Sequence, residues 1–153
     1  MRALLSIFLL LLSLATRAQS TDALYDEGKK LYDQKKYELA VKKLLPAAQK
    51  GHKKAQYRMG RCCDKGHGVP EDNKKAFFWY DKAAQQGHAK SQYQLGKCYL
   101  KGKGTEKNTE KAKTWLLKAV KNPKGGDKVV EKLNEDAADG DSDAIAMKKL
   151  IGK

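Results

Sequence analysis

Residues 52–87 read HKKAQYRMGRCCDKGHGVPEDNKKAFFWYDKAAQQG, and residues 88–122 read HAKSQYQLGKCYLKGKGTEKNTEKAKTWLLKAVKN. A shift of 36 residues superimposes the two segments at a run of glycine, alanine and tryptophan positions. These positions are Gly60, Gly66, Gly68, Ala76, Trp79 and Ala83 in the first segment, and Gly96, Gly102, Gly104, Ala112, Trp115 and Ala119 in the second. So many coincidences at one offset indicate a tandem repeat, and a period of this size is typical of stacked supersecondary units.

Each segment predicts two helices, A and B, joined by a glycine-rich loop. In the second segment, apolar residues recur at helical spacing from about His88 to Lys101, which predicts helix A. Gly102 and Gly104 follow it and allow left-handed backbone at the helix end. Asn108 then offers a capping oxygen to helix B, as Asp72 does one repeat earlier. Glycine and alanine on the facing sides of the helices predict a close approach between neighbours.

The remaining chain extends this pattern in both directions. Residues 19–51 carry a shorter helix pair that lacks the glycine-rich loop, and residues 123–153 contain two weaker helical segments, at about 127–138 and 142–151. The last pair matches the repeat poorly and is interpreted as a degenerate capping pair that shields the final apolar face. The sequence therefore predicts an all-α fold, an α/α solenoid of helix-turn-helix repeats.

The repeat resembles a known family. AQYRMG at residues 55–60, GHGVPED at residues 66–72 and KAFFWYDKAAQQGH at residues 75–88 are similar to the Sel-one-like repeat (SLR), a longer-looped relative of the tetratricopeptide repeat. Residues 52–87 and 88–122 both resemble SLR repeats, although Thr105 and Asn108 replace the usual valine and aspartate. Residues 19–51 look more like a plain tetratricopeptide unit. The resemblance implies a protein that serves as an adaptor or scaffold for other proteins, and some exported members are proposed to bind cell-wall material.

Residues 1–18 have the organisation of a secretory signal peptide. Met1 and Arg2 provide a positive start, a short apolar run follows, and small residues precede the expected cleavage after Ala18. We therefore expect a mature chain that begins at Gln19 and is exported, either periplasmic or secreted. Once the signal is removed, no integral membrane segment is expected.

The charge balance limits the class of partner. The chain has 32 basic and 18 acidic residues, a formal net charge of +14. All but four of the basic residues are lysine, and lysine lacks the planar fork with which arginine recognises phosphate and bases. Together with export, this argues against nucleic acid as a partner. An acidic protein segment and an acidic envelope polymer remain as counter-charges.

No residue set predicts catalysis, a cofactor or a metal site. The three histidines lack a second ligand at metal spacing and are expected to have structural roles in turns. Ser91 and Ser142 have no glycine elbow around them. An acidic cluster near the C-terminus lacks the spacing of a calcium loop and is interpreted as a solvated acidic cap. Its members are Glu135, Asp136, Asp139, Asp141 and Asp143. The protein is therefore predicted not to be an enzyme.

The three cysteines are expected to be free thiols. Cysteine-rich members of the family join helix A to helix B within each repeat, and no helix B of this chain carries a cysteine. Cys62 and Cys98 are equivalent residues of successive A helices and are expected to lie too far apart to form a disulfide.

The resemblance implies that the A helices line a concave face. At matching positions of three A helices, a tyrosine is followed four residues later by a cation, and residues at this spacing share one helix face. The predicted partner-binding pairs are Tyr25 with Lys29, Tyr57 with Arg61, and Tyr93 with Lys97. Such a surface suits an acidic protein or peptide segment. The alternative interpretation is that the tyrosines are packing residues of the repeat.

These observations favour a non-catalytic scaffold of the bacterial cell envelope that binds another protein through the concave helix-A face. The alternative function is a binder of an acidic cell-wall polymer, of the peptidoglycan type, through the lysine-rich surface.

Overall fold

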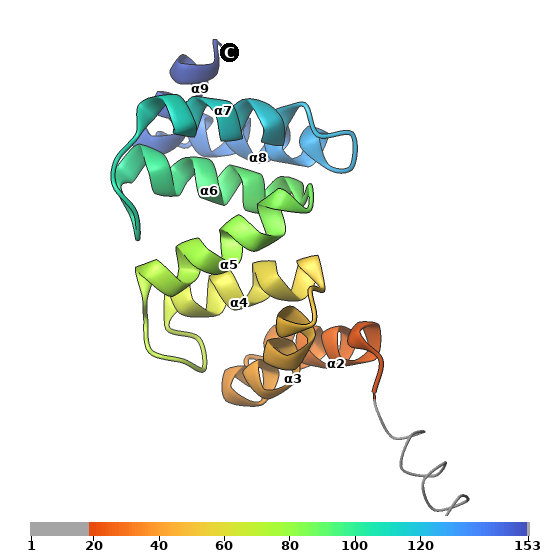
Figure 1. Cartoon of the computed structure of the whole chain (residues 1–153). Helices are drawn as coiled ribbons and strands as arrows, with labels where there is room; N and C mark the ends of the chain where they lie inside the picture. The colour runs from red at the N-terminus through yellow and green to blue at the C-terminus, as the bar shows by residue number, and fades with distance from the viewer. Residues whose placement is uncertain (1–18, 153) are drawn as a thin grey trace, which may run out of the picture.

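The computed structural model describes residues 19–152, and the predicted signal peptide lies outside the described residues. The described part consists of eight α-helices and has no strand, which confirms the predicted all-α fold (Figure 1). The helices are α2 (Thr21–Asp33), α3 (Tyr37–Gln49), α4 (Lys53–Lys65), α5 (Asn73–Gln85), α6 (Ala89–Lys101), α7 (Thr109–Val120), α8 (Gly126–Ala138) and α9 (Ser142–Ile151).

The helices stack in chain order as a solenoid. Helix α2 packs on α3, α4 on α5 and α6 on α7, and the pairs contact one another through α3 with α4 and α5 with α6. Figure 1 shows this order running from α2 and α3 at the bottom of the view to α9 at the top. The C-terminal pair continues the stack, but α8 also contacts α6, so it lies against two helices of the preceding repeat.

Histidines begin the A helices of both long repeats. The Nδ1 atom of His52 accepts the amide N–H of Ala55 at 3.1 Å, and Nδ1 of His88 accepts the amide N–H of Ser91 at 3.2 Å. These bonds satisfy backbone donors that a helix N-terminus leaves without partners. His52 and His88 therefore have the structural role in the turns that the sequence predicts.

The other predicted helix ends are also present. Asp72 and Asn108 cap α5 and α7 by accepting backbone N–H groups at 3.0 Å and 2.8 Å. Gly66 and Gly102 end α4 and α6 with φ of 66° and 71°, in the left-handed region where a side chain is strained. The capping residues and the glycines thus determine where the helices of each long repeat begin and end.

Glycines set the spacing between helices A and B in each of the first three units. The pairs in contact are Gly28 with Leu44, Gly60 with Tyr80, and Gly96 with Leu116. A Cβ atom built on Gly60 would lie 2.5 Å from Cδ1 and Cε1 of the Tyr80 ring, closer than side-chain carbons pack. The close approach predicted at Gly60 and Gly96 is therefore confirmed.

A second pair of glycines joins successive units. The loop glycine Gly68 lies against the first backbone atoms of α3, where an added Cβ would come within 2.5 Å of the Tyr37 carbonyl. Gly104 lies in the same way against the backbone of Asn73, which begins α5. Each glycine-rich loop thus packs on helix B of the preceding unit.

The other shared repeat positions form the core. Ala76, Ala83, Ala112 and Ala119 are buried, whereas the two tryptophans, Trp79 and Trp115, are half-buried at its margin. Small residues at these positions let the helices approach closely while excluding water.

Buried glutamines connect the units. The Gln56 Nε2 atom donates to the carbonyl of Ala48 at 3.1 Å, and its Oε1 accepts from Gln86 Nε2 at 2.7 Å. Gln92 repeats this pattern one unit later and accepts from Asn122 at 2.9 Å. These bonds satisfy buried polar groups at the unit boundaries, where helix ends would otherwise leave backbone carbonyls without partners.

The three cysteines, Cys62, Cys63 and Cys98, are free and buried. Cys63 and Cys98 belong to one core cluster that also contains Ala76 and Tyr80. They pack there as small apolar side chains.

Candidate partner-binding site

Helices α4, α6 and α8 enclose two adjoining hollows, which together we call the groove. The first, the Arg61 hollow, has a volume of about 420 Å³, and the second, the Tyr93 hollow, about 490 Å³. Both are lined by Tyr57, Gln94, Lys97 and Lys132. Because α4 and α6 are the A helices of the two long repeats, the hollowed surface is the helix-A side of the solenoid.

Four of the six residues predicted to bind a partner line the groove. Tyr57, Arg61 and Lys97 surround the Arg61 hollow, and Tyr93 lines the hollow beside it. The structure therefore brings the second and third predicted pairs together.

The first predicted pair, Tyr25 and Lys29, lines neither hollow. Lys29 forms an ion pair with Asp33 at 3.1 Å on the exposed side of α2. Tyr25 stacks on His52, with ring centroids 4.6 Å apart.

The tyrosines also contribute to packing. Tyr57 lies beside the His88 ring at 4.9 Å, as Tyr25 lies on His52, so each packs on the histidine that caps the next A helix. Tyr93 is only 8% exposed and belongs to the C-terminal core cluster with Val129. Burial raises the pKa of Tyr93 to about 12, so its hydroxyl stays protonated at neutral pH. Tyr57 and Tyr93 therefore both pack against neighbouring side chains of the repeat and line the groove.

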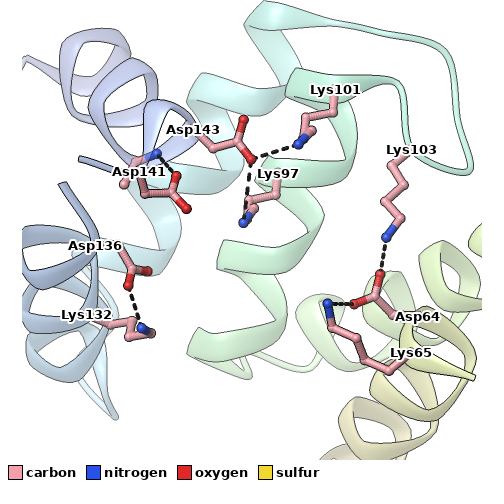
Figure 2. Close-up of polar contacts among 10 residues, drawn as sticks. Asp64, Lys65, Lys97, Lys101, Lys103, Lys132, Asp136, Asp141 and Asp143 are labelled. Atoms are coloured by element: carbon pink, nitrogen blue, oxygen red, sulfur yellow. Dashed lines mark hydrogen bonds and ion pairs between the residues drawn. The ribbon is translucent and has the colours of Figure 1, made fainter. Parts of the chain in front are cut away.

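Helix α8 and the start of α9 close one side of the groove with acidic residues (Figure 2). Asp143 accepts from Lys101 at 2.8 Å and lies 3.9 Å from Lys97, while Asp136 pairs with Lys132 at 2.5 Å. Asp141 instead accepts the Ala144 amide and caps α9. Glu135, Asp139 and Asp141 are exposed, as a solvated acidic cap predicts, whereas Asp136 and Asp143 are half-buried and form ion pairs. Lys132 lies one turn before Asp136 on α8, and Lys101 belongs to α6.

One carboxylate lies inside the Arg61 hollow. Asp64 pairs at 2.5 Å with Lys103, which lies in the loop after α6, and at 3.7 Å with Lys65 (Figure 2). Arg61 has no carboxylate partner among residues 19–152; its guanidinium lies 5.6 Å from the centre of the Tyr32 ring. Arg61 is therefore the cation of this hollow that forms no ion pair with an acid of the described residues.

Tyr80 forms the floor of the Arg61 hollow and was not among the predicted residues. Its side chain is 1% exposed, it lines the hollow, and its hydroxyl has no hydrogen-bond partner in the described structure. The available signal was a break in the repeat, because the equivalent positions 36 residues away on either side hold leucine, Leu44 and Leu116.

Two further observations bear on what the site does. Within residues 19–152, no group of three or more histidine, cysteine or acidic side chains is arranged to hold a metal ion. In the same part of the chain, no helix has the length and apolar composition that crossing a membrane requires.

Comparison with known proteins identifies the repeats. Residues 53–88 and 89–123 each match the family model of the Sel1 repeat. The fold is similar to the crystal structure of a Sel1 repeat protein from Oxalobacter formigenes, with a TM-score of 0.64 and 33% sequence identity over 84% of this chain and 53% of that one. It is also similar to a protective antigen with an SLR fold, present in uropathogenic Escherichia coli strains. For that structure the TM-score is 0.66 and the identity 27%, over 88% of this chain and 30% of the other.

The chain thus spans about half the length of the first of these structures and less than a third of the second. A search of curated proteins found no match.

Proposed function

We propose that this chain, whose residues 53–123 form two Sel1 repeats, is a scaffold of the cell envelope that binds a partner protein through the groove. Sel1 repeat proteins are generally non-catalytic and mediate protein interactions. The observation that carries the proposal is the groove itself, because aromatic and cationic side chains of two successive A helices line adjoining hollows there. Such hollows accept anchoring side chains of a partner, while the lysines increase the rate of encounter with an acidic surface.

The proposal assigns an acidic segment as the partner's contacting surface. Arg61 forms no ion pair among the described residues, and Lys97 is 3.9 Å from its closest carboxylate, in Asp143. A carboxylate from outside would therefore meet cations that the chain balances poorly. Exposed apolar side chains are few along this face, so the charge contributes most of the complementarity.

The test is capture of proteins from an envelope extract by the purified protein and by two charge-reversed variants. The first carries Arg61→Glu and Lys97→Glu in the groove. The second, a matched control, carries Lys42→Glu and Lys113→Glu on exposed positions of α3 and α7, with the same change in net charge. Circular dichroism verifies that all three have equal helicity.

A protein that the unchanged chain and the control retain, and the groove variant loses, would support the proposal. Equal capture by all three at equal helicity would remove the groove as the binding surface. Loss of capture with both variants would indicate an interaction that depends only on net charge.

That last outcome leads to the second candidate, a binder of an acidic cell-wall polymer. The net charge of +14, almost entirely from lysine, favours it. Purified cell-wall sacculi would then sediment the protein in a salt-sensitive way, and both double variants would bind less by the same factor.

Export is part of the proposal and rests on the composition of residues 1–18. The mass of the protein recovered from the envelope fraction tests it, since cleavage after Ala18 leaves a chain that begins at Gln19. A full-length mass, recovered from the cytoplasmic fraction, would contradict export.

A further inference from the structure

We propose that the Arg61 hollow is a pocket for a single carboxylate of the bound partner, held by the Arg61 guanidinium and the Tyr80 hydroxyl. The inference rests on the proposed function, because it names the chemical group that enters the groove and the residues that recognise it. Three observations carry it: a buried hydroxyl without a partner, a cation without a counter-charge, and a break in the repeat at the position that supplies the hydroxyl.

The first observation is the Tyr80 hydroxyl. Its oxygen is buried and forms no hydrogen bond within the described residues, although buried hydroxyls in folded proteins almost always find a partner. Burial raises the pKa of Tyr80, and the neighbouring groups that affect it are Asp64, Tyr57, Cys98 and Arg61. All four line the Arg61 hollow, as Tyr80 itself does. The hydroxyl is a protonated donor that lacks an acceptor.

The second observation is the charge of the wall. Six cations and one acid line the hollow, and the cations are Arg61, Lys65, Lys97, Lys101, Lys103 and Lys132. Asp64 is occupied by Lys103 and Lys65, and the acids of α8 and α9 pair with the other three lysines. Within residues 19–152, this leaves Arg61 without an ion pair, in the hollow that Tyr80 also lines.

The third observation is the repeat. Leu44, Tyr80 and Leu116 occupy the same position of helix B and each packs against a glycine of helix A. Leucine therefore satisfies the fold in two of the three units. The phenol of the middle unit adds a polar atom that packing does not require. A ligand that accepts its hydrogen bond would give this atom a role.

The chemistry of these groups favours a carboxylate over a phosphate. A planar carboxylate matches the fork of a guanidinium, and a phenol adds a short charge-assisted hydrogen bond. Asp64 lines the same hollow, and its negative charge repels a dianion more strongly than a monoanion. Two lysines of the same hollow, Lys101 and Lys132, already bind carboxylates of the chain itself, those of Asp143 and Asp136.

An incoming carboxylate reaches the covered hydroxyl by displacing the ends of long cationic side chains. Lys65 and Lys101 at the opening are exposed, and such side chains change rotamer within nanoseconds without movement of the backbone. The volume of about 420 Å³ accommodates one acidic side chain and its neighbours in the partner.

The test is calorimetric titration of the full protein with a hexaglutamate peptide at physiological ionic strength. Tyr80→Phe removes one hydroxyl and no charge, so attraction to the lysine surface as a whole is unchanged. We expect it to weaken hexaglutamate binding roughly tenfold, the effect of one hydrogen bond to a charged group. Arg61→Lys, which keeps the charge but removes the fork, is expected to weaken binding by a similar factor. Tyr37→Phe, which removes a hydroxyl outside both hollows, is the matched control and should bind like the unchanged protein.

Equal affinity for hexaglutamate with and without the Tyr80 hydroxyl would overturn the inference, as would no binding to the unchanged protein. Inorganic phosphate is titrated in parallel, and tighter binding of phosphate with the same dependence on Tyr80 would overturn the assignment to a carboxylate. These failures are distinct from failure of the proposed function. If a partner is still lost with Arg61→Glu and Lys97→Glu but retained with Tyr80→Phe, the groove binds it without this pocket.

Discussion

Replacing Tyr80 with phenylalanine is expected to stabilise the free protein. In most proteins this change removes a hydrogen bond and destabilises, but the Tyr80 hydroxyl is buried without a partner. An unsatisfied buried hydroxyl costs about 1–3 kcal/mol, and phenylalanine fills nearly the same space without it. Since part of that cost is relieved by local adjustment, we expect the free energy of unfolding to rise by about 1 kcal/mol. For a chain of this size that corresponds to an increase in Tm of about 2–4 °C.

Tyr32→Phe is the matched control for this measurement. Tyr32 is 7% exposed, and its hydroxyl is hydrogen-bonded to Nδ1 of His67 at 2.9 Å. Loss of that bond leaves the imidazole nitrogen without its partner, so we expect a decrease of about 1 kcal/mol in the free energy of unfolding. Urea and thermal unfolding, followed by far-ultraviolet circular dichroism, compare the two variants with the unchanged protein.

The opposite signs of the two changes test the reasoning. If Tyr80→Phe destabilises the protein as much as Tyr32→Phe does, the Tyr80 hydroxyl has an acceptor in the free protein, such as an ordered water. The argument from an unpartnered donor would then fail, and with it the reason to place a ligand there.

Three further measurements examine the fold. Gly60→Ala places a Cβ within 2.5 Å of the Tyr80 ring, so we expect this clash to lower the free energy of unfolding by about 1–3 kcal/mol. The higher helix propensity of alanine offsets about 1 kcal/mol of that loss. A variant that is more stable in urea unfolding would contradict the close packing. Burial, and then nearby lysines, lower the pKa of His88 from 6.5 to about 4, so the unfolded chain takes up a proton first as the pH falls. Stability is therefore fully present above pH 6.5 and is lost toward pH 4, by up to about 3 kcal/mol; His88→Asn keeps a capping side chain and should flatten this profile. Burial raises the pKa of Cys62 to about 12 and of Cys98 to about 11, so alkylation at pH 8 should label no thiol in the native protein and all three in denaturant, as measured by mass spectrometry.

The repeating part of the fold could be predicted because its determinants are local and occur twice. A glycine at a helix end, a capping side chain and a small residue at a helix crossing each act on the nearest turn of backbone. The shift of 36 residues shows which of them recur. Gly60, Gly102 and Asn108 accordingly have the roles that their spacing predicts.

The candidate site could be predicted only in part, because its third wall does not repeat. The last helix pair lacks the repeat pattern, so nothing in the sequence indicated that α8 contacts α6 or that Asp143 reaches Lys97 and Lys101. The first unit fails for the opposite reason. Tyr25 matches Tyr57 in register, but it lies on α2. The groove is enclosed by α4, α6 and α8, and no residue of α2 lines either hollow.

Tyr80 links the stability of the repeat to its selectivity. In the free protein its unpartnered hydroxyl is expected to lower stability, while Leu44 and Leu116 show that an apolar residue is sufficient for packing at this position. A ligand that brings an acceptor removes the penalty, whereas an apolar side chain in the same hollow leaves the hydroxyl without an acceptor and Arg61 without a counter-charge. Sites with buried polar groups reject ligands that cannot pair them far more strongly than apolar pockets reject a misfit. The destabilising hydroxyl would therefore confer preference for a carboxylate within a surface whose many lysines attract any anion.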